Sequence, residues 1–240
     1  MVALLSRGNL SVRLAAGPAD VESAQRLRGR AFRRDEGLDA DAVDCRCEHA
    51  LIEREGVLQA TFRFQRFASG SDVVTGYSGQ VYDLARLAAR QGPMIEVGRF
   101  CIAPGVQDPD LVRLGWAALT RIVDAEGATF LFGCSSFHGT DATPYADALR
   151  LLAARHVAPP DLAPGRRSDD VVTLPVGQID GAEAQRQMPP LLRTYLLMGG
   201  WVSDHLVVDR VMETLHVFTA VEIAKVPENR ARALRLLAGD

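Results

Sequence analysis

An acid and a base lie inside an otherwise apolar run, Met94-Ile95-Glu96-Val97-Gly98-Arg99-Phe100-Cys101-Ile102. The run predicts a buried strand that ends before Pro104. Burying an unpaired ion is costly, so a fold that accepts this strand must give Glu96 and Arg99 partners or a function. A regular strand points the two side chains to opposite faces. Gly98 predicts a bulge, which would turn both toward one side.

Two interpretations of Glu96 remain open. In the structural one, Glu96 forms an ion pair with Arg99 or with Arg63, which lies in a predicted strand at 57–67. In the functional one, its carboxylate accepts a proton from an attacking amine, directly or through water. A glutamate in a partly desolvated cleft suits this role of general base.

The composition is that of a folded globular chain, with 48% hydrophobic and 24% charged residues among 240. A net charge of −3 argues against a dedicated nucleic-acid binder. Arginines and then acids cluster near the first third of the chain: Arg26, Arg28, Arg30, Arg33, Arg34, Asp35, Glu36, Asp39, Asp41 and Asp44. The acids are expected to form a solvated loop. In the alternative, they hold a cationic amine substrate and the arginines hold its carboxylate.

Cysteine usage and hydropathy indicate a cytoplasmic protein. Four cysteines, at 45, 47, 101 and 134, are too few and too irregularly placed for a disulfide scaffold. No secretory signal is visible, and no apolar run approaches the length that spans a bilayer. Cys45, Cys47 and His49 would share one face of a strand, but zinc usually needs a fourth ligand and wider spacing, so no metal site is expected.

Hydrophobic periodicity and turn residues predict alternating strands and helices. Strands are expected at 10–14, 49–54, 57–67, 94–103, 130–135, 171–176, around 202–208 and at 215–223. Helices are expected at 20–34, with Asp20 as cap, and at 82–89, 109–127, 143–156, 189–199 and 227–237. Residues 177–187 are expected to be exposed and mobile. This order predicts a mixed α/β layer fold.

Two polar segments follow predicted strands. The loop from Pro104 to Leu114 opens a helix whose first N–H groups attract phosphate, with Arg113 adding charge, although an ordinary strand–helix connection explains it equally. The turn Ser135-Ser136-Phe137-His138-Gly139-Thr140-Asp141 offers hydroxyls to a substrate amide. Three neighbours in sequence rarely form a Ser/His/Asp triad, so a turn capped by Thr140 or Asp141 is favoured.

Four motifs in this order resemble the GNAT superfamily of N-acyltransferases. The branch that they resemble includes ornithine acyl-ACP N-acyltransferases and, more distantly, acyl-homoserine-lactone autoinducer synthases. The motifs are Leu27-Arg28-Gly29-Arg30-Ala31-Phe32, Asp44-Cys45-Arg46-Cys47-Glu48-His49-Ala50-Leu51, Glu96-Val97-Gly98-Arg99-Phe100 and Phe132 to Asp141. The segment Pro189 to Val202 is also typical of the ornithine branch. The resemblance covers most of residues 10 to 224.

The resemblance implies a GNAT-like acyltransferase fold, with a mixed central sheet flanked by helices. It implies a single domain, 1–240, with an extended C-terminal part from about residue 160. It also implies transfer of a 3-hydroxyacyl chain from acyl carrier protein to the α-amine of ornithine, which gives a lyso-ornithine lipid. The donor is a 4'-phosphopantetheine thioester, so no separate cofactor is expected. Peripheral membrane contact is compatible with an amphiphilic product.

Site roles follow from the resemblance. Glu96 is the expected base. Substrate binding is assigned to Arg28, Phe32, Asp44, Arg63 and Arg99. Acyl or pantetheine binding is assigned to Phe100, Cys101, Ile102, Arg113, Ser135 and Ser136, with oxyanion donors from the backbone near Cys101 and Ile102. Exposed arginines near 113, 121, 150 and 155 are expected to dock the acidic carrier protein.

The motifs depart from the family pattern in three places, and two other functions remain open. The acidic loop from Asp35 to Asp41 is shorter than the resemblance leads us to expect. Glu48 replaces a usual aspartate, and the loop before the helix at 109 lacks the fuller glycine pattern of the superfamily. One alternative is autoinducer synthesis with S-adenosylmethionine, but the tryptophan expected near residues 35 to 40 is missing. The other is a non-catalytic protein that binds acyl carrier protein or a membrane, which the presence of Glu96 argues against.

Overall fold

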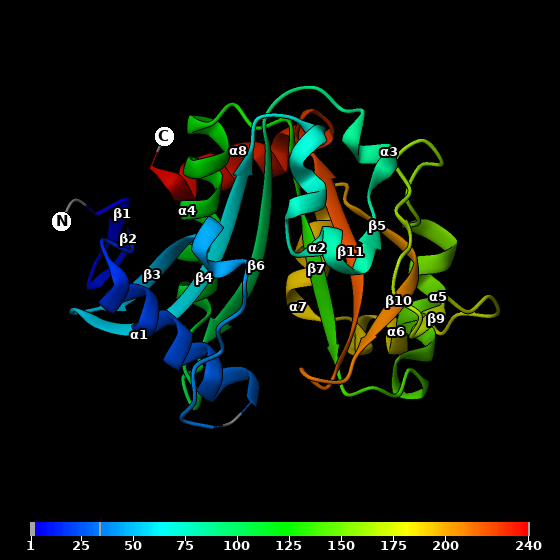
Figure 1. Ribbon diagram of the computed structural model, residues 1–240, viewed down its shortest axis with the longest axis horizontal. Helices are drawn as coiled ribbons and strands as arrows, with labels where there is room; N and C mark the ends of the chain where they lie inside the picture. The colour runs from blue at the N-terminus through cyan, green and yellow to red at the C-terminus, as the bar shows by residue number, and fades with distance from the viewer. Residues whose placement is uncertain (1–2, 34, 240) are drawn as a thin grey trace. The chain divides into compact units, whose positions relative to one another are not determined.

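The computed structural model describes residues 3–33 and 35–239, so Arg34 lies outside the described part. The chain divides into two compact units (Figure 1). Unit 1 comprises residues 1–66, 95–128 and 228–240, and unit 2 comprises residues 67–94 and 129–227. The part of the chain from residue 160 onward therefore contributes to both units. The single domain expected for residues 1–240 stays a prediction.

Unit 1 is built on strands that neighbour one another in the order β1-β2-β3-β4-β6. The first three neighbouring pairs are antiparallel. The strands are β1 (Leu5–Arg7), β2 (Leu10–Leu14), β3 (Glu48–Arg54), β4 (Val57–Phe67) and β6 (Met94–Ile102). Glu55-Gly56 forms the turn between β3 and β4, with both residues at positive φ. The ranges predicted for β2, β3, β4 and β6 are confirmed to within one residue at each end, whereas β1 was not predicted.

Three helices belong to unit 1: α1 (Pro18–Arg28), α4 (Pro109–Ala125) and α8 (Glu228–Ala238). Helix α4 packs on β1, β2 and β3, and α8 lies beside α4 (Figure 1). The prediction that Asp20 caps α1 is wrong. Gly17 precedes the helix and Pro18 starts it, while the Asp20 carboxylate binds Arg13 at 2.6 Å and accepts the N–H of Ala16 at 2.8 Å.

A close contact joins α4 to the sheet of unit 1. A Cβ atom added at Gly115 of α4 would lie 2.6 Å from the Phe100 ring. On its other side this ring stacks on Phe62 of β4, with centroids 5.8 Å apart. Gly115 therefore lets α4 approach β6 at the point where Phe100 fills the space between helix and sheet.

Unit 2 holds an antiparallel ladder in the order β7-β11-β10-β9. Its strands are β7 (Phe130–His138), β9 (Val171–Thr173), β10 (Trp201–Asp209) and β11 (Thr214–Glu222). A short separate pair joins β5 (Tyr82–Asp83) to β8 (Gly165–Arg166). The buried residues of β11 are divided between two apolar clusters. Phe218 and Ala220 belong to one, and Leu215 and Val217 belong to the other. This alternation is what a strand covered on both faces requires.

The helices of unit 2 are α2 (Ser78–Val81), α3 (Ala85–Ala88), α5 (Ala146–Arg155), α6 (Gly181–Gln187) and α7 (Pro190–Leu197). The helix predicted at 82–89 is partly wrong, because Tyr82 and Asp83 pair with β8 and only the following turn is helical. The mobile segment predicted at 177–187 is also wrong in part. Asp180 accepts the N–H groups of Ala182 and Glu183 and caps α6. The turn predicted at 135–141 is wrong in its first part, because β7 continues to His138 and contains Ser135 and Ser136. Its end is as expected, since Asp141 accepts the N–H of Thr143.

No helix within residues 3–33 and 35–239 combines the length and the apolar character needed to cross a lipid bilayer.

Candidate active site

Strand β6 contains a backbone irregularity at Arg99. This residue has φ = 55°, in the left-handed region that residues other than glycine seldom occupy. The strand is irregular at Arg99 and not at Gly98. The bulge expected at Gly98 stays a prediction. A non-glycine residue held in this conformation costs about 1–3 kcal/mol and often marks a functional site.

The break at Arg99 changes which side chains share a face. Glu96 and Phe100 have the even spacing that places both on one face of a regular strand. Phe100 stacks on Phe62. The charge of Glu96, by contrast, acts on the Cys47 thiol together with that of Arg63, the neighbour of Phe62 on β4. Glu96 is only 5% exposed, and its charge reaches a thiol that the charges of Asp41, Asp44 and Arg63 also reach.

Arg28, at the end of α1, is 1% exposed and holds two carboxylates. Its Nε donates to Asp39 Oδ2 at 2.9 Å, and its Nη1 and Nη2 donate to the two oxygens of Asp44 at 2.9 and 2.7 Å. Nη2 also donates to the carbonyl of Asp39. Gln25, one turn earlier, donates to Asp44 Oδ2 at 2.9 Å. Arg28 therefore fixes the acidic loop onto α1.

Two further arginines complete this network. Arg63 of β4 donates to Asp41 at 2.6 and 2.8 Å and to Asp44 at 2.6 Å. Arg99 of β6 donates to Asp39 at 3.0 Å and to Asp41 at 3.3 Å. We call Arg28, Arg63, Arg99, Asp39, Asp41 and Asp44 the charged cluster. Its three guanidiniums match its three carboxylates, so its formal charges sum to zero.

The arginines control the protonation of the cluster. Burial by itself would raise the pKa of Asp44, but hydrogen bonds and charge from Arg28 and Arg63 outweigh it and hold that pKa below its ordinary value. The pKa of Asp41 is also lowered, because Arg63 and Arg99 outweigh the effect of burial. Both carboxylates are ionised at neutral pH. Burial lowers the pKa of the neighbouring His49 despite the opposing charge of Asp44.

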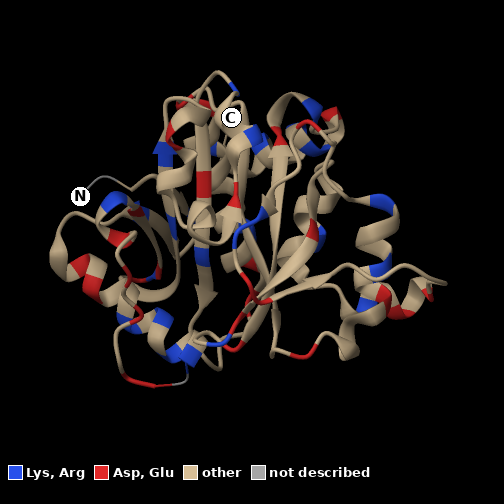
Figure 2. Ribbon diagram, turned by 45° about the vertical axis from the view of Figure 1, so that its right-hand side comes forward, with Lys and Arg blue, Asp and Glu red and all other residues tan. Residues whose placement is uncertain are grey.

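A π-helical turn, Gly29–Arg33, follows α1 and carries Phe32. A Cβ at Gly29 would lie 2.0 Å from the carbonyl oxygen of Gly37, so only glycine allows the acidic loop to pass this close. Figure 2 shows basic residues (blue) at the end of α1 and in this turn, followed by acidic residues (red) in the loop. One-turn π segments inside or after α-helices frequently occur at functional sites.

Beyond the charged cluster, the predicted site residues lie in different environments. Cys101 is buried, and burial raises the pKa of its thiol to about 12, so it is no thiolate at neutral pH. Arg113 is exposed and pairs with Asp110 at 2.8 Å. Ser135 and Ser136 belong to unit 2, where Ser135 is buried and Ser136 is exposed. As neighbours on β7 they point to opposite faces, so one ligand cannot contact both hydroxyls from the same side.

The strand face predicted for Cys45, Cys47 and His49 is wrong. Cys45 lies in a 3-10 turn, Asp44–Arg46, and β3 begins only at Glu48. Within the described parts of the chain, no group of three or more His, Cys, Asp or Glu side chains could hold a metal ion.

Sequence reasoning missed Gln25 as a member of the site. It placed Asp39 and Asp41 alike in a solvated loop or, in the alternative, against a cationic amine substrate. Asp39 is 4% exposed. The available signal was the order of charges, since Arg28 is followed by acids at a distance that lets a loop fold back. Nothing in that order distinguishes Asp39 and Asp41 from Asp35 or Glu36.

Comparison with known proteins identifies the family. Residues 24–117 match the family described as Acetyltransferase (GNAT) domain. A protein of Brucella abortus (strain 2308), named L-ornithine N(alpha)-acyltransferase, is 30% identical over 91% of this chain and 86% of its own length. The chain belongs to the L-ornithine N(alpha)-acyltransferase family. A relative of the same name from Rhodobacter capsulatus is 29% identical over 90% of this chain and 91% of its own length.

Comparison with a solved structure supports the fold expected for the L-ornithine N(alpha)-acyltransferase family. The solved structure of an N-acyl amino acid synthase from uncultured soil microbes superposes with a TM-score of 0.53, at 11% identity, over 96% of this chain and 97% of that one. The expected GNAT-like α/β fold is thereby confirmed. The matched residues 24–117 include all six members of the charged cluster as well as Glu96.

Proposed function

We propose that the protein transfers a 3-hydroxyacyl chain from the thioester of acyl carrier protein to the α-amino group of ornithine, giving a lyso-ornithine lipid. The observation that carries the proposal is the 30% identity to an L-ornithine N(alpha)-acyltransferase over 91% of the chain. Glu96, buried in the same unit as the charged cluster, supports the chemistry.

Acyl transfer to an amine needs a base, because a protonated amine has no lone pair to donate. Glu96 takes a proton from the α-ammonium group of ornithine, directly or through water. The amine nitrogen then attacks the thioester carbon, and the carbonyl oxygen becomes an oxyanion. When this intermediate collapses, the C–S bond breaks and the amide forms. The nitrogen loses its second proton in this step, and the pantetheine sulfur takes up that proton and leaves as a thiol.

The oxyanion needs N–H donors, which the strand beyond Arg99 is suited to supply. The left-handed backbone at Arg99 interrupts the regular strand immediately before Phe100, Cys101 and Ile102. We assign the oxyanion donors to the backbone near Cys101 and Ile102. The Phe100 ring already packs against Phe62 and α4, which favours a supporting role for it over contact with the acyl chain.

The acceptor amino acid meets the more exposed end of the charged cluster. The Asp41 side chain is 27% exposed and that of Arg99 is 14% exposed, whereas those of Arg28 and Arg63 are at most 3% exposed. Asp41 and Arg99 therefore offer one acid and one base to the charged groups of ornithine. Arg28, Arg63 and Asp44 position this end from within, and Phe32 borders it from the π-helical turn.

The donor side involves arginines on a helix of each unit. Arg113 and Arg121 lie on α4 in unit 1, and Arg121 donates to the carbonyl of Leu4 at 2.9 Å. Arg150 and Arg155 lie on α5 in unit 2. In the proposal, Arg113 and Ser136 bind the pantetheine arm, and the acidic carrier protein docks on the arginines. The pantetheine thioester is the acyl source in the cytoplasm. The buried Ser135 needs a rearrangement to contact it.

Autoinducer synthesis is the second candidate, and ornithine is favoured because the two relatives described above both carry the ornithine acyltransferase name. Incubation with acyl carrier protein thioester and either amine distinguishes the two by mass spectrometry. A lactone formed without any ornithine amide would reject the proposal. A protein that binds the carrier but forms neither product would be the non-catalytic binding protein.

The variant Glu96→Gln tests the base. It keeps the size of the side chain and removes its ability to take a proton, so kcat should fall about 10²–10⁴-fold while the KM for ornithine changes little. Glu48→Gln is the matched control, because Glu48 is a partly exposed glutamate that pairs with Arg66 on the surface. Unchanged turnover in Glu96→Gln would remove the base role.

A further inference from the structure

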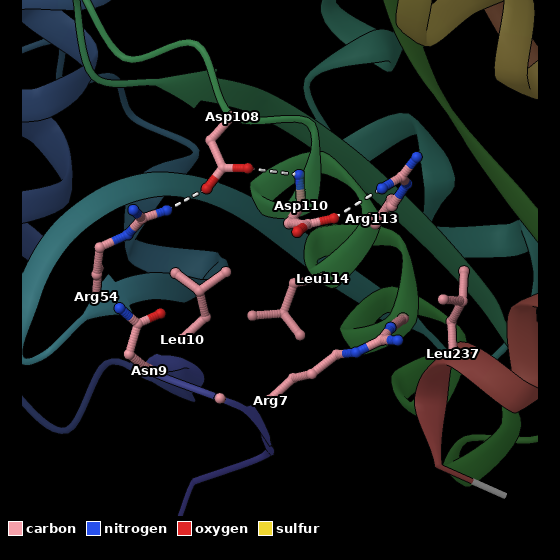
Figure 3. Close-up of a pocket in the computed structure, with 11 residues that line it drawn as sticks. Arg7, Asn9, Leu10, Arg54, Asp108, Asp110, Arg113, Leu114 and Leu237 are labelled. Carbon is pink, nitrogen blue, oxygen red and sulfur yellow. Dashed lines mark hydrogen bonds and ion pairs between the residues drawn. The ribbon is translucent and has the colours of Figure 1, made fainter.

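Unit 1 contains a cavity of about 400 Å³ whose lining includes Arg113 but neither Glu96 nor any member of the charged cluster. It lies between the β1–β2 turn, the end of β3, the first turns of α4 and Leu237 of α8 (Figure 3). Its volume is within the range of small-ligand sites.

The lining of the cavity has two kinds of surface. Leu10, Leu114 and Ala117 form an apolar part and are each at most 8% exposed. Arg7, Arg54 and Arg113 supply guanidinium groups. Figure 3 shows Arg7 extending from the β1–β2 turn toward the side of Leu237.

Most of the charge around the cavity is cancelled, but one cation remains. Arg54 pairs with Asp108, and Arg113 pairs with Asp110. Arg7 is exposed and has no carboxylate partner among residues 3–33 and 35–239. An anionic group that enters the cavity therefore meets a net charge of +1 without having to displace a carboxylate from Arg7.

Helix α8 continues the combination of apolar and positively charged side chains beyond the cavity. Leu237 lines the cavity, and the adjacent Leu236 is 68% exposed. Arg230 and Arg232 are exposed on the same helix, and neither pairs with a carboxylate in the described part of the chain. An exposed leucine beside unpaired arginines suits a surface that contains both negative charge and hydrocarbon.

We propose that this cavity binds the anionic headgroup of a membrane phospholipid. The headgroup phosphate pairs with Arg7, while the glycerol and upper acyl carbons contact Leu114 and Leu237. A free phosphate ion would use the guanidinium and leave the apolar wall and Leu236 without a contact. The proposal rests on the cavity and α8 and does not depend on the acyl-transfer reaction.

Co-sedimentation of the full chain with phosphatidylcholine vesicles, with and without phosphatidylglycerol, tests the proposal. The wild type should bind the phosphatidylglycerol vesicles more tightly. Arg7→Gln should lower that binding about fivefold, as expected for one arginine at an anionic surface. Arg26→Gln is the control, because it removes the same charge from an exposed pair with Glu22 on α1.

Three outcomes would overturn the proposal. The first is equal binding to vesicles with and without phosphatidylglycerol. The second is an equal loss in Arg7→Gln and Arg26→Gln. The third is a thermal shift with inorganic phosphate that requires Arg7, in a chain that binds neither vesicle, because the cavity would then take a free phosphate.

The same variants separate this proposal from the proposed function. Arg7→Gln should keep full acyl transfer to ornithine in vesicle-free buffer, which also shows that it folds. A wild type that lacks this transfer but binds phosphatidylglycerol through Arg7 would reject the proposed function alone.

Discussion

The interiors of the two units are built from different chemistry. In unit 1 the charged cluster places six ionised side chains among the strands and α1, and four of them are at most 6% exposed. In unit 2 the cluster around Tyr82 is aromatic, with the rings of Tyr82, Phe132 and Trp201 each packed against Phe218. Its buried polar groups include His205 and His216, which lie beside the Tyr82 ring.

The difference between the two interiors indicates that unit 1 has buried charges at a cost in folding stability. Replacing a buried ion network by apolar side chains is often neutral or stabilising, whereas removing one partner is strongly destabilising. The apolar interior of unit 2 is what packing alone would favour. The charged interior of unit 1 therefore indicates a task there, and the buried Glu96 belongs to the same unit.

Asp44→Asn should have the largest effect and is the strongest test of the difference between the two interiors. Asp44 receives hydrogen bonds from both Arg28 and Arg63, so its loss leaves buried positive charge without a full partner. We expect the free energy of unfolding of unit 1 to fall by about 3–5 kcal/mol. Urea unfolding followed by Trp116 fluorescence, in a Trp201→Phe background, measures it, because the chain has two tryptophans and Trp116 belongs to unit 1.

The matched control for Asp44→Asn is Asp124→Asn. Asp124 pairs with Arg235 between α4 and α8, with side chains 32% and 49% exposed, and this loss should cost less than about 1 kcal/mol. Equal losses in the two variants would show that the charged cluster does not hold unit 1 together.

Acid unfolding tests the same difference between the two interiors, with a smaller expected effect on the free energy of unfolding. The folded pKa values of Asp41 and Asp44 lie below the ordinary value of 3.8, so below about pH 4 the unfolded chain binds more protons than the folded one. Their contribution is present above this pH and is lost as the pH falls. Each such group contributes up to about 1.4 kcal/mol per pH unit.

The test of the acid effect is the slope of unfolding free energy against pH, measured below pH 4 by Trp116 fluorescence. Asp44→Asn should flatten it by up to about 1.4 kcal/mol per unit, because one titrating group is gone. A slope that Asp44→Asn does not alter would contradict the lowered pKa of Asp44.

The sequence predicted the strands of unit 1 well, because alternation of buried and polar side chains is a local property. It also predicted that β6 would be irregular and that Glu96 and Arg99 would be functional or paired. The position of the irregularity was wrong by one residue. A glycine is the usual residue for a positive φ, and the contacts of the Arg99 side chain with Asp39 and Asp41 are not local.

The partners within the charged cluster could not be read from the sequence. Asp39 and Asp41 have the same composition around them as the exposed acids before them, and only the path of the loop distinguishes them. That path depends on Gly29 passing Gly37 at a distance that excludes a Cβ atom. The cap of α6 was missed for a different reason: Asp180 directly before Gly181 was a usable signal, and the loop-like composition around it was weighed more heavily.

Tyr82→Phe in unit 2 should have the smallest effect of the three on stability. Tyr82 is fully buried, and burial raises the pKa of its phenol, so the hydroxyl remains a donor. It donates to the carbonyl of His216 at 2.7 Å, and losing this bond in the interior should cost about 1–2 kcal/mol. Trp201 fluorescence in a Trp116→Phe background reports on unit 2.

The matched control is Tyr145→Phe, which removes a 2.8 Å bond to the carbonyl of His138. This site is partly exposed, so water replaces the donor, and the loss should cost less than about 0.5 kcal/mol. A loss in Tyr82→Phe as large as that in Asp44→Asn would mean that buried neutral groups hold unit 2 as strongly as buried ions hold unit 1, and the contrast between the two interiors would then be one of composition only.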